Sequence, residues 1–227
     1  MQKIFFILTC LFLGTNALFA QGFYRIKADF SIKEKLANGK QQLTMGVVYY
    51  DKNTKKIVYD VRFPEKKRLL LQDTSFYEIG ANGKLIKRKK NLLVPEFSMF
   101  HLILNGNLAD FGLQNSFYKP EKVEKDGNMV ITTWQPDEKM AKFFGQVLVS
   151  NVEKKLHGVI IYDTKKNLVS KQIFKTYTNV KGCNVPTELV QVLYAKEGKN
   201  YQITTYKNIK INDNADQNLY NLAIPKP

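Results

Sequence analysis

The chain has 227 residues, with 35 lysines and arginines against 20 acidic residues, which gives a formal net charge of +15. A chain of this length can bury a full hydrophobic core, and β-rich domains often reach it as one unit. Beyond residue 20 no stretch approaches the roughly 18 consecutive apolar residues that a transmembrane helix requires.

Residues 1–20 have the pattern of a secretory signal peptide. Lys3 precedes the apolar run 4–13, Gly14 breaks it, and Ala20 is a small residue at the expected cleavage site. An uncleaved membrane anchor is the alternative, but the run is short for a span. A lipid-anchored form would need a small residue directly before Cys10, where Thr9 fits poorly. We therefore expect an exported, soluble chain.

Cleavage would remove Lys3 and Cys10, leaving a net charge of +14 and Cys183 as the one cysteine, so that no internal disulfide can form. In a cytosolic protein the basic runs 66–68 and 87–90 would suggest nucleic acid. Export argues against that partner. In an exported protein these runs are candidates for contact with an anionic membrane surface. The alternative is that they are simply exposed to solvent.

Most of the exported part alternates with a period of two, which is typical of β-strands. Residues 43–49, 57–63, 129–134 and 202–206 show it, and the segment 23–32 alternates in the same way. Turn signals such as 38–39 and 82–83 (Asn-Gly) separate the runs at hairpin distance, so neighbouring strands should pair antiparallel. About eleven strands are too many for one flat sheet, so we expect the sheet to curl.

Residues 95–115 break this rhythm and are expected to be helical. Phe97, Phe100 and Leu104 recur at helical spacing with Ile103 beside them, and Gly106 is a natural stop. We expect short helices here that lie on the concave side of the sheet, with the ring of His101 pointing to solvent. Whether they enclose a ligand cavity or complete a dry core is left open by the pattern.

Residues that would support catalysis are sparse. The two histidines are isolated, and the sequence has no HExxH motif, nucleophile elbow or glycine-rich phosphate loop. We expect no enzyme, no metal and no cofactor. The alternative is a hydrolase built on two of the scattered carboxylates meeting in space.

Three segments carry a resemblance to a known family: 56–77, an aromatic strand ending in Pro64 followed by two further strands; 185–190, which contains Pro186-Thr187; and 203–225, a last strand followed by an aromatic residue and Pro225. In these the chain resembles the periplasmic lipoprotein carriers of the LolA type and the wider outer-membrane lipoprotein-sorting proteins. The resemblance implies an incomplete antiparallel barrel closed on one side by helices, with an apolar interior for acyl chains. The family usually opens with a helix, where this chain has the alternating segment 23–32.

Taken together, these patterns predict a signal peptide at 1–20 and a single LolA-like half-barrel domain at 21–227. The fold class is mainly β (α+β), a curled antiparallel sheet covered on its concave face by short helices. The predicted function is a soluble periplasmic carrier that shelters the acyl chains of a lipoprotein or lipid and delivers them towards the outer membrane. A sensor or partner-docking module on the same scaffold is the alternative. The predicted ligand-binding residues are Phe97, Phe100, Ile103 and Leu104 for the cover, and Tyr59, Val61, Leu70, Tyr77 and Trp134 for the inner wall.

Overall fold

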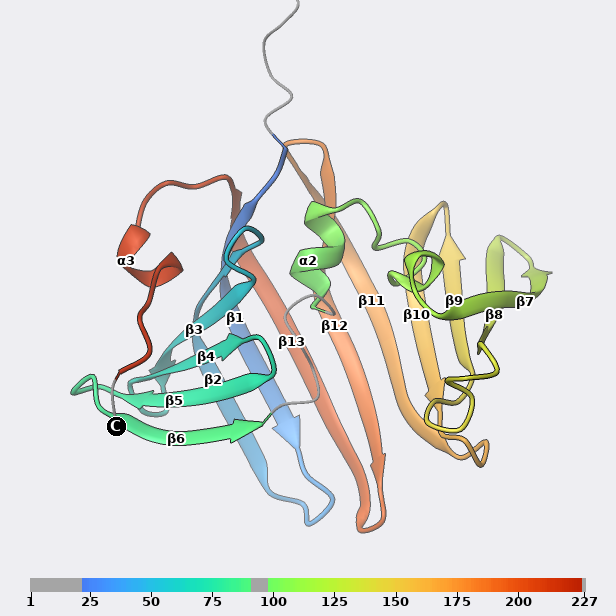
Figure 1. Ribbon diagram of the computed structural model, residues 1–227, viewed down its shortest axis with the longest axis horizontal. Helices are drawn as coiled ribbons and strands as arrows, with labels where there is room; N and C mark the ends of the chain where they lie inside the picture. The colour runs from blue at the N-terminus through green and yellow to red at the C-terminus, as the bar shows by residue number, and fades with distance from the viewer. Residues whose placement is uncertain (1–21, 91–97, 226–227) are drawn as a thin grey trace, which may run out of the picture.

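The computed structural model describes residues 22–90 and 98–225, and these contain a single antiparallel sheet of thirteen strands (Figure 1). The strands are β1 (Arg25–Lys35), β2 (Gln41–Asp51), β3 (Lys56–Phe63), β4 (Lys67–Gln72), β5 (Ser75–Gly80), β6 (Leu85–Lys90), β7 (Tyr118–Asp126), β8 (Met129–Pro136), β9 (Val147–Val152), β10 (Lys155–Tyr162), β11 (Leu168–Val180), β12 (Cys183–Ala195) and β13 (Gly198–Ile211). The short helices are α2 (Met99–Leu104), the 3-10 turn η2 (Leu113–Asn115) and α3 (Gln217–Tyr220). The predicted cleavage site and the predicted cover residue Phe97 lie outside the described residues.

The strand order shows that the sheet is open. It runs β6-β5-β4-β3-β2-β1-β13-β12-β11-β10-β9-β8-β7, so the first and last strands pair in the middle of the sheet and the consecutive strands β6 and β7 are its two edges. Phe30 of β1 lies opposite Tyr206 of β13 in this central pair. A closed barrel has no edges. The predicted curled, mainly β architecture is therefore confirmed as an open sheet.

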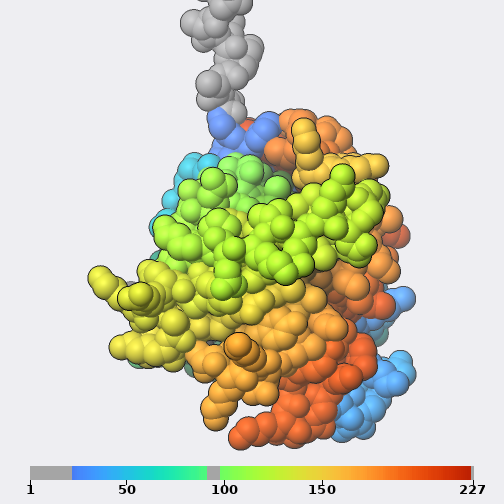
Figure 2. All heavy atoms as spheres, turned by 90° about the vertical axis from the view of Figure 1, so that its right-hand side faces the viewer, coloured from blue at the N-terminus to red at the C-terminus, as the bar shows by residue number. Residues whose placement is uncertain are grey.

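The hairpin turns follow the predicted signals. Gly39 and Gly83 adopt φ of +82° and +78°, conformations that cost glycine little and explain the Asn-Gly pairs. Residues 23–32, which alternate in the sequence, belong largely to β1 and not to a helix. From the side of β7, the residues coloured from lime to orange present a continuous surface (Figure 2).

Alternate residues of each strand face opposite sides of the sheet. Ile26 and Phe30 of β1 share one side, which the strand pairing continues to Tyr50 on β2 and Tyr206 on β13. We call this side the inner face, because it bears the larger of two buried hydrophobic clusters. The opposite side, the outer face, bears a smaller cluster on β2–β5 that includes Tyr220 of α3.

The predicted helical region 95–115 is only partly helical. Helix α2 has six residues, and Gly106 follows it at φ +71°. Its N-cap is Ser98, whose side chain accepts a hydrogen bond from the backbone N–H of His101. None of the helices in the described part of the chain is long and apolar enough to cross a bilayer.

Candidate functional site

The inner face and the residues that pack on it form the candidate site. Six predicted site residues fall in its buried cluster: Tyr59 at its margin, and Val61, Phe100, Ile103, Leu104 and Trp134 within it. Tyr59 lies opposite Val48, and Val61 lies opposite Gly46, on the strand pair β2–β3. Residues far apart in the sequence are thus brought together by the strand register and by α2.

Helix α2 is held on this face by aromatic contacts. The ring of Phe100 meets that of Tyr206 edge-on at 5.3 Å between centroids, and it stacks at 6.5 Å on Tyr50. The Tyr50 hydroxyl forms a hydrogen bond of 2.6 Å with Nδ1 of His101. The expectation that His101 turns its ring to solvent is therefore wrong: its contact with a fully buried tyrosine ties α2 to β2.

Leu70 and Tyr77 lie on the other side of the sheet. The pairing of β3 with β4 places Leu70 beside Val58, and β4–β5 pairing places it opposite Tyr77, both on the outer face. These side chains are buried against Tyr49 and Tyr220 in the smaller cluster. They were predicted to share the inner wall with Tyr59 and Val61. Because side chains alternate between the two sides of a strand, a shift of one position places Leu70 and Tyr77 on the opposite side of the sheet.

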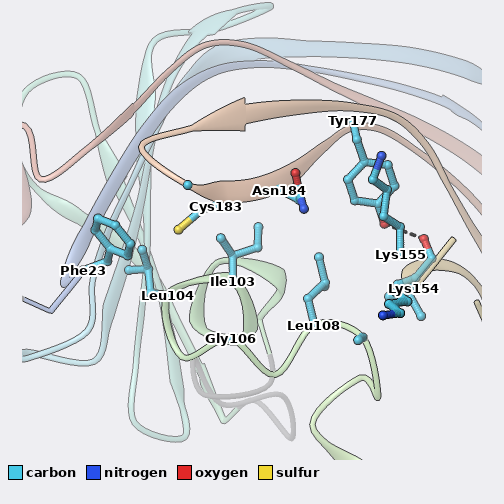
Figure 3. A pocket seen from close by; sticks show the side chains of 13 residues that line it. Phe23, Ile103, Leu104, Gly106, Leu108, Lys154, Lys155, Tyr177, Cys183 and Asn184 are labelled. Carbon is cyan, nitrogen blue, oxygen red and sulfur yellow. Dashed lines mark hydrogen bonds between the residues drawn. The ribbon is translucent and has the colours of Figure 1, made fainter.

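A pocket of about 320 Å³ opens beside the C-terminal end of α2 (Figure 3). Ile103 and Leu104 of α2 and the following Leu108 form one side. Leu156 and Cys183 come from the strands opposite, and the remaining lining residues are Phe23, Gly106, Ala109, Lys154, Lys155, Tyr177, Gly182 and Asn184. The pocket lining is continuous with the buried cluster of the inner face, because Ile103, Leu104, Leu108 and Leu156 belong to both.

The environment of the inner face disfavours charge. Burial raises the pKa of Tyr59 to about 12, and burial followed by the nearby Tyr59 raises the pKa of Tyr206 well above its usual value. Burial also raises the pKa of the Cys183 thiol, which keeps it protonated and unreactive near neutral pH. The buried Nε1 of Trp134 has no hydrogen-bond partner among the described residues. Such a face suits an apolar ligand.

The residues for metal or carboxylate chemistry do not gather here. Within residues 22–90 and 98–225, no group of three or more histidine, cysteine or acidic side chains is placed to hold a metal ion. Two carboxylates of the sheet are instead engaged in ion pairs: Asp51 with Arg25 at 2.5 Å, and Glu78 with Lys67 at 2.7 Å.

Several residues of the inner-face cluster were not singled out from the sequence: Leu102 in α2, Leu108 after it, Leu113 in η2, and Phe174, Val185 and Tyr206 on the long strands. The leucines lie in the segment predicted to be helical, so their apolar character was a usable signal. The strand residues could be identified only from the pairing register, because the register decides which of the two alternating sets of apolar side chains faces α2.

Neither a protein-family model nor a curated protein matches the sequence. Solved structures match the fold. A LolA superfamily protein from Nitrosomonas europaea is 13% identical, with 88% of this chain and 91% of that chain covered and a TM-score of 0.57. A putative outer membrane lipoprotein-sorting protein domain from Vibrio parahaemolyticus is 12% identical, with 88% and 91% covered and a TM-score of 0.59.

A DUF1329 family protein from Desulfovibrio piger is 14% identical, with 88% of this chain and 90% of that chain covered and a TM-score of 0.60. Sequence identities this low establish the fold alone. The chain therefore has a LolA-like fold over most of its length, and the resemblance read from its sequence motifs is confirmed at that level.

Proposed function

We propose that this protein is a non-enzymatic periplasmic carrier that binds the acyl chains of a lipoprotein or lipid on its inner face and delivers them towards the outer membrane. The observation that carries the proposal is the contact of the short apolar helix α2 with the inner face, beside an open pocket that is lined in part by residues of the same buried cluster. The likeness to a domain described as lipoprotein-sorting supports it.

In this account α2 is the cover of the concave face. It buries Phe100, Ile103 and Leu104 on the sheet. An acyl chain taking their place would regain the same kind of contact, at about 0.8 kcal/mol per buried methylene. The binding energy comes from removing apolar surface from water and needs no covalent step and no cofactor.

The volume of the pocket sets a condition on binding. About 320 Å³ is at the low end of the roughly 300–1,000 Å³ of small-molecule sites. A second or longer acyl chain therefore requires α2 to move away from the sheet. The helix has six residues, and its side-chain cap and its hydrogen bond to Tyr50 are local contacts that such a movement can break. We propose that the pocket admits the end of a chain and that displacement of α2 admits the rest.

A matched pair of substitutions tests this proposal. Ala109 lines the pocket and is exposed, so Ala109→Trp would place an indole ring there with little strain in the core. Ala141 is also exposed but lies outside the pocket, and Ala141→Trp is the control. We expect Ala109→Trp to weaken the binding of an acylated peptide by roughly tenfold or more, the equivalent of about two buried methylenes, and Ala141→Trp to leave it unchanged. Equal binding by both variants would contradict the proposed position of the site.

A further inference from the structure

The outer face of β9–β13 carries apolar side chains where a solvent-facing antiparallel sheet normally carries polar ones. We call these residues the outer patch: Leu148, Ile160, Ile173, Val190, Val192, Tyr201 and Ile203. Three of them are well exposed: Ile173 by 39%, Ile203 by 40% and Tyr201 by 46%. Exposed apolar side chains that adjoin one another mark a contact surface more often than scattered ones do.

The strand register shows that the outer patch is contiguous. In one row across the sheet, Ile173 lies opposite Val190, and Val190 lies opposite Ile203. In the next row Tyr201 lies opposite Val192. The second row then continues through Lys171 to Ile160 and Leu148 on β10 and β9. Side chains in such cross-strand positions touch one another, so the patch is one surface and not separate residues.

Another part of the outer face shows what a covered region looks like. On β2–β5 the outer side chains Val47, Tyr49, Leu70 and Tyr77 are at most 7% exposed, because Tyr220 and its neighbours from the C-terminal segment pack on them. The exposed fractions of Ile173, Tyr201 and Ile203 in the outer patch are several times larger. The same face therefore has one apolar region that the chain covers itself and one that it leaves to solvent.

Lysines interleave with the outer patch. Lys33 lies opposite Ile203, Lys35 opposite Tyr201, and Lys171 opposite Val192. All three are exposed. Glu188, the acidic residue next to the patch, is 3.8 Å from Lys175 and so is already partly neutralised. The patch thus combines apolar surface with exposed positive charge.

The combination of apolar side chains and lysines indicates which kind of partner the outer patch can bind. In a second copy of this chain, docking face to face would bring lysines against lysines, which is unfavourable. An anionic lipid surface accepts both features, because lysine stems lie along apolar surface while the ammonium groups reach the headgroups. The basic runs noted in the sequence are elsewhere and partly engaged: Lys67 pairs with Glu78, and Arg88 stacks on Tyr77 at 5.5 Å.

We propose that the outer patch docks the protein on the surface of a membrane that contains anionic phospholipid. The apolar side chains of β11–β13 rest at the headgroup boundary, and Lys33, Lys35 and Lys171 contact the phosphates. The contact uses the face opposite to the one that holds α2. Docking and acyl binding can therefore occur together and can be measured separately.

Vesicle flotation tests the proposal on the chain purified after export, with mass spectrometry to show that residues 1–20 are absent. The probes are vesicles of phosphatidylcholine alone and vesicles with added phosphatidylglycerol. The patch variant is Ile173→Thr with Tyr201→Thr and Ile203→Thr, which keeps β-propensity. The control is Val123→Thr with Val130→Thr, two exposed valines of β7 and β8 outside the patch.

We expect the unmodified chain to float with the anionic vesicles and not with the neutral ones, and the patch variant to lose roughly tenfold or more of this binding. Lys33→Gln with Lys171→Gln should lose a similar factor, and the control Lys119→Gln with Lys125→Gln should not. Equal flotation of the patch variant and its control would overturn the proposal. The proposal would also be overturned if the chain bound neither kind of vesicle and instead self-associated through the patch or captured an acidic protein. Unchanged acyl-peptide binding by the patch variant would show that the carrier function is intact.

Discussion

The charge pair between β1 and β2 gives the sharpest prediction about stability. Arg25 donates from Nε to Oδ2 of Asp51 at 2.5 Å, and both residues are at most 9% exposed. Arg25 also donates to the side-chain oxygen of Gln217 at 2.8 Å, and its guanidinium lies 4.6 Å from the ring centre of Tyr220. This one arginine therefore joins the centre of the sheet to the C-terminal segment that covers Leu70 and Tyr77.

The substitution Asp51→Asn isolates the charge. An asparagine keeps an oxygen that can accept from the backbone N–H groups of Asn53 and Thr54, which lie 2.8 and 3.0 Å from Oδ1 of Asp51. It leaves the guanidinium of Arg25 buried without its counter-charge. Removing one partner of a buried pair costs about 3–5 kcal/mol. Because Gln217 and Tyr220 still contact Arg25, we expect the lower value, about 3 kcal/mol, and a loss in Tm of roughly 6–12 °C for a chain of this size.

The control is Asp60→Asn on the same sheet. Asp60 pairs with Arg68 at 3.3 Å, and the two side chains are 24% and 42% exposed. Such a solvated pair is worth about 0–1 kcal/mol. Urea and thermal unfolding followed by circular dichroism would measure both variants. If Asp51→Asn lost no more stability than Asp60→Asn, the account of Arg25 as the link between sheet and C-terminal segment would be refuted.

Three further predictions concern single side chains. Leu70→Ala should lower the free energy of unfolding by about 2–5 kcal/mol and leave acyl-peptide binding unchanged, whereas Ile103→Ala should alter that binding; unfolding curves and titrations of both variants would show this. The thiol of Cys183, with its raised pKa, should react with iodoacetamide at pH 8 more slowly than free cysteine, and an equal rate would contradict its burial. Tyr59 and Tyr177 have pKa values raised to about 12, above their unfolded value near 10, so the folded state holds protons that the unfolded state releases. The stability that they contribute should be intact below pH 10 and fall as the pH rises towards 12, as measured by urea unfolding; a flat profile would count against it.

The sequence predicted the fold well because its strand signals are local. Alternation and Asn-Gly turns are properties of a few adjacent residues, and β1 and the first hairpins follow directly from them. The basic run 87–90 was interpreted from the sequence only as a charged surface. In the structure it belongs to the edge strand β6 (Leu85–Lys90), where lysines are favourable because they discourage pairing with other chains.

The candidate site was predicted less completely because it depends on distant contacts. Residues 69–71 are three consecutive leucines, so alternation could not tell which of them faces α2. Leu70 is buried on the outer face because Tyr220, 150 positions away, packs there. In the same way the position of His101 is set by Tyr50, which no pattern within the helix reveals.

Binding of acyl chains to the inner face can be measured directly. The most direct test is to titrate the chain purified after export with a peptide carrying an N-terminal acyl group and with the same peptide without it, by isothermal calorimetry. We expect the acylated peptide to bind with a negative heat-capacity change, because apolar surface is buried, and the unacylated peptide not to bind measurably. Equal binding of the two peptides would contradict the carrier function and favour a partner-docking role for the same fold.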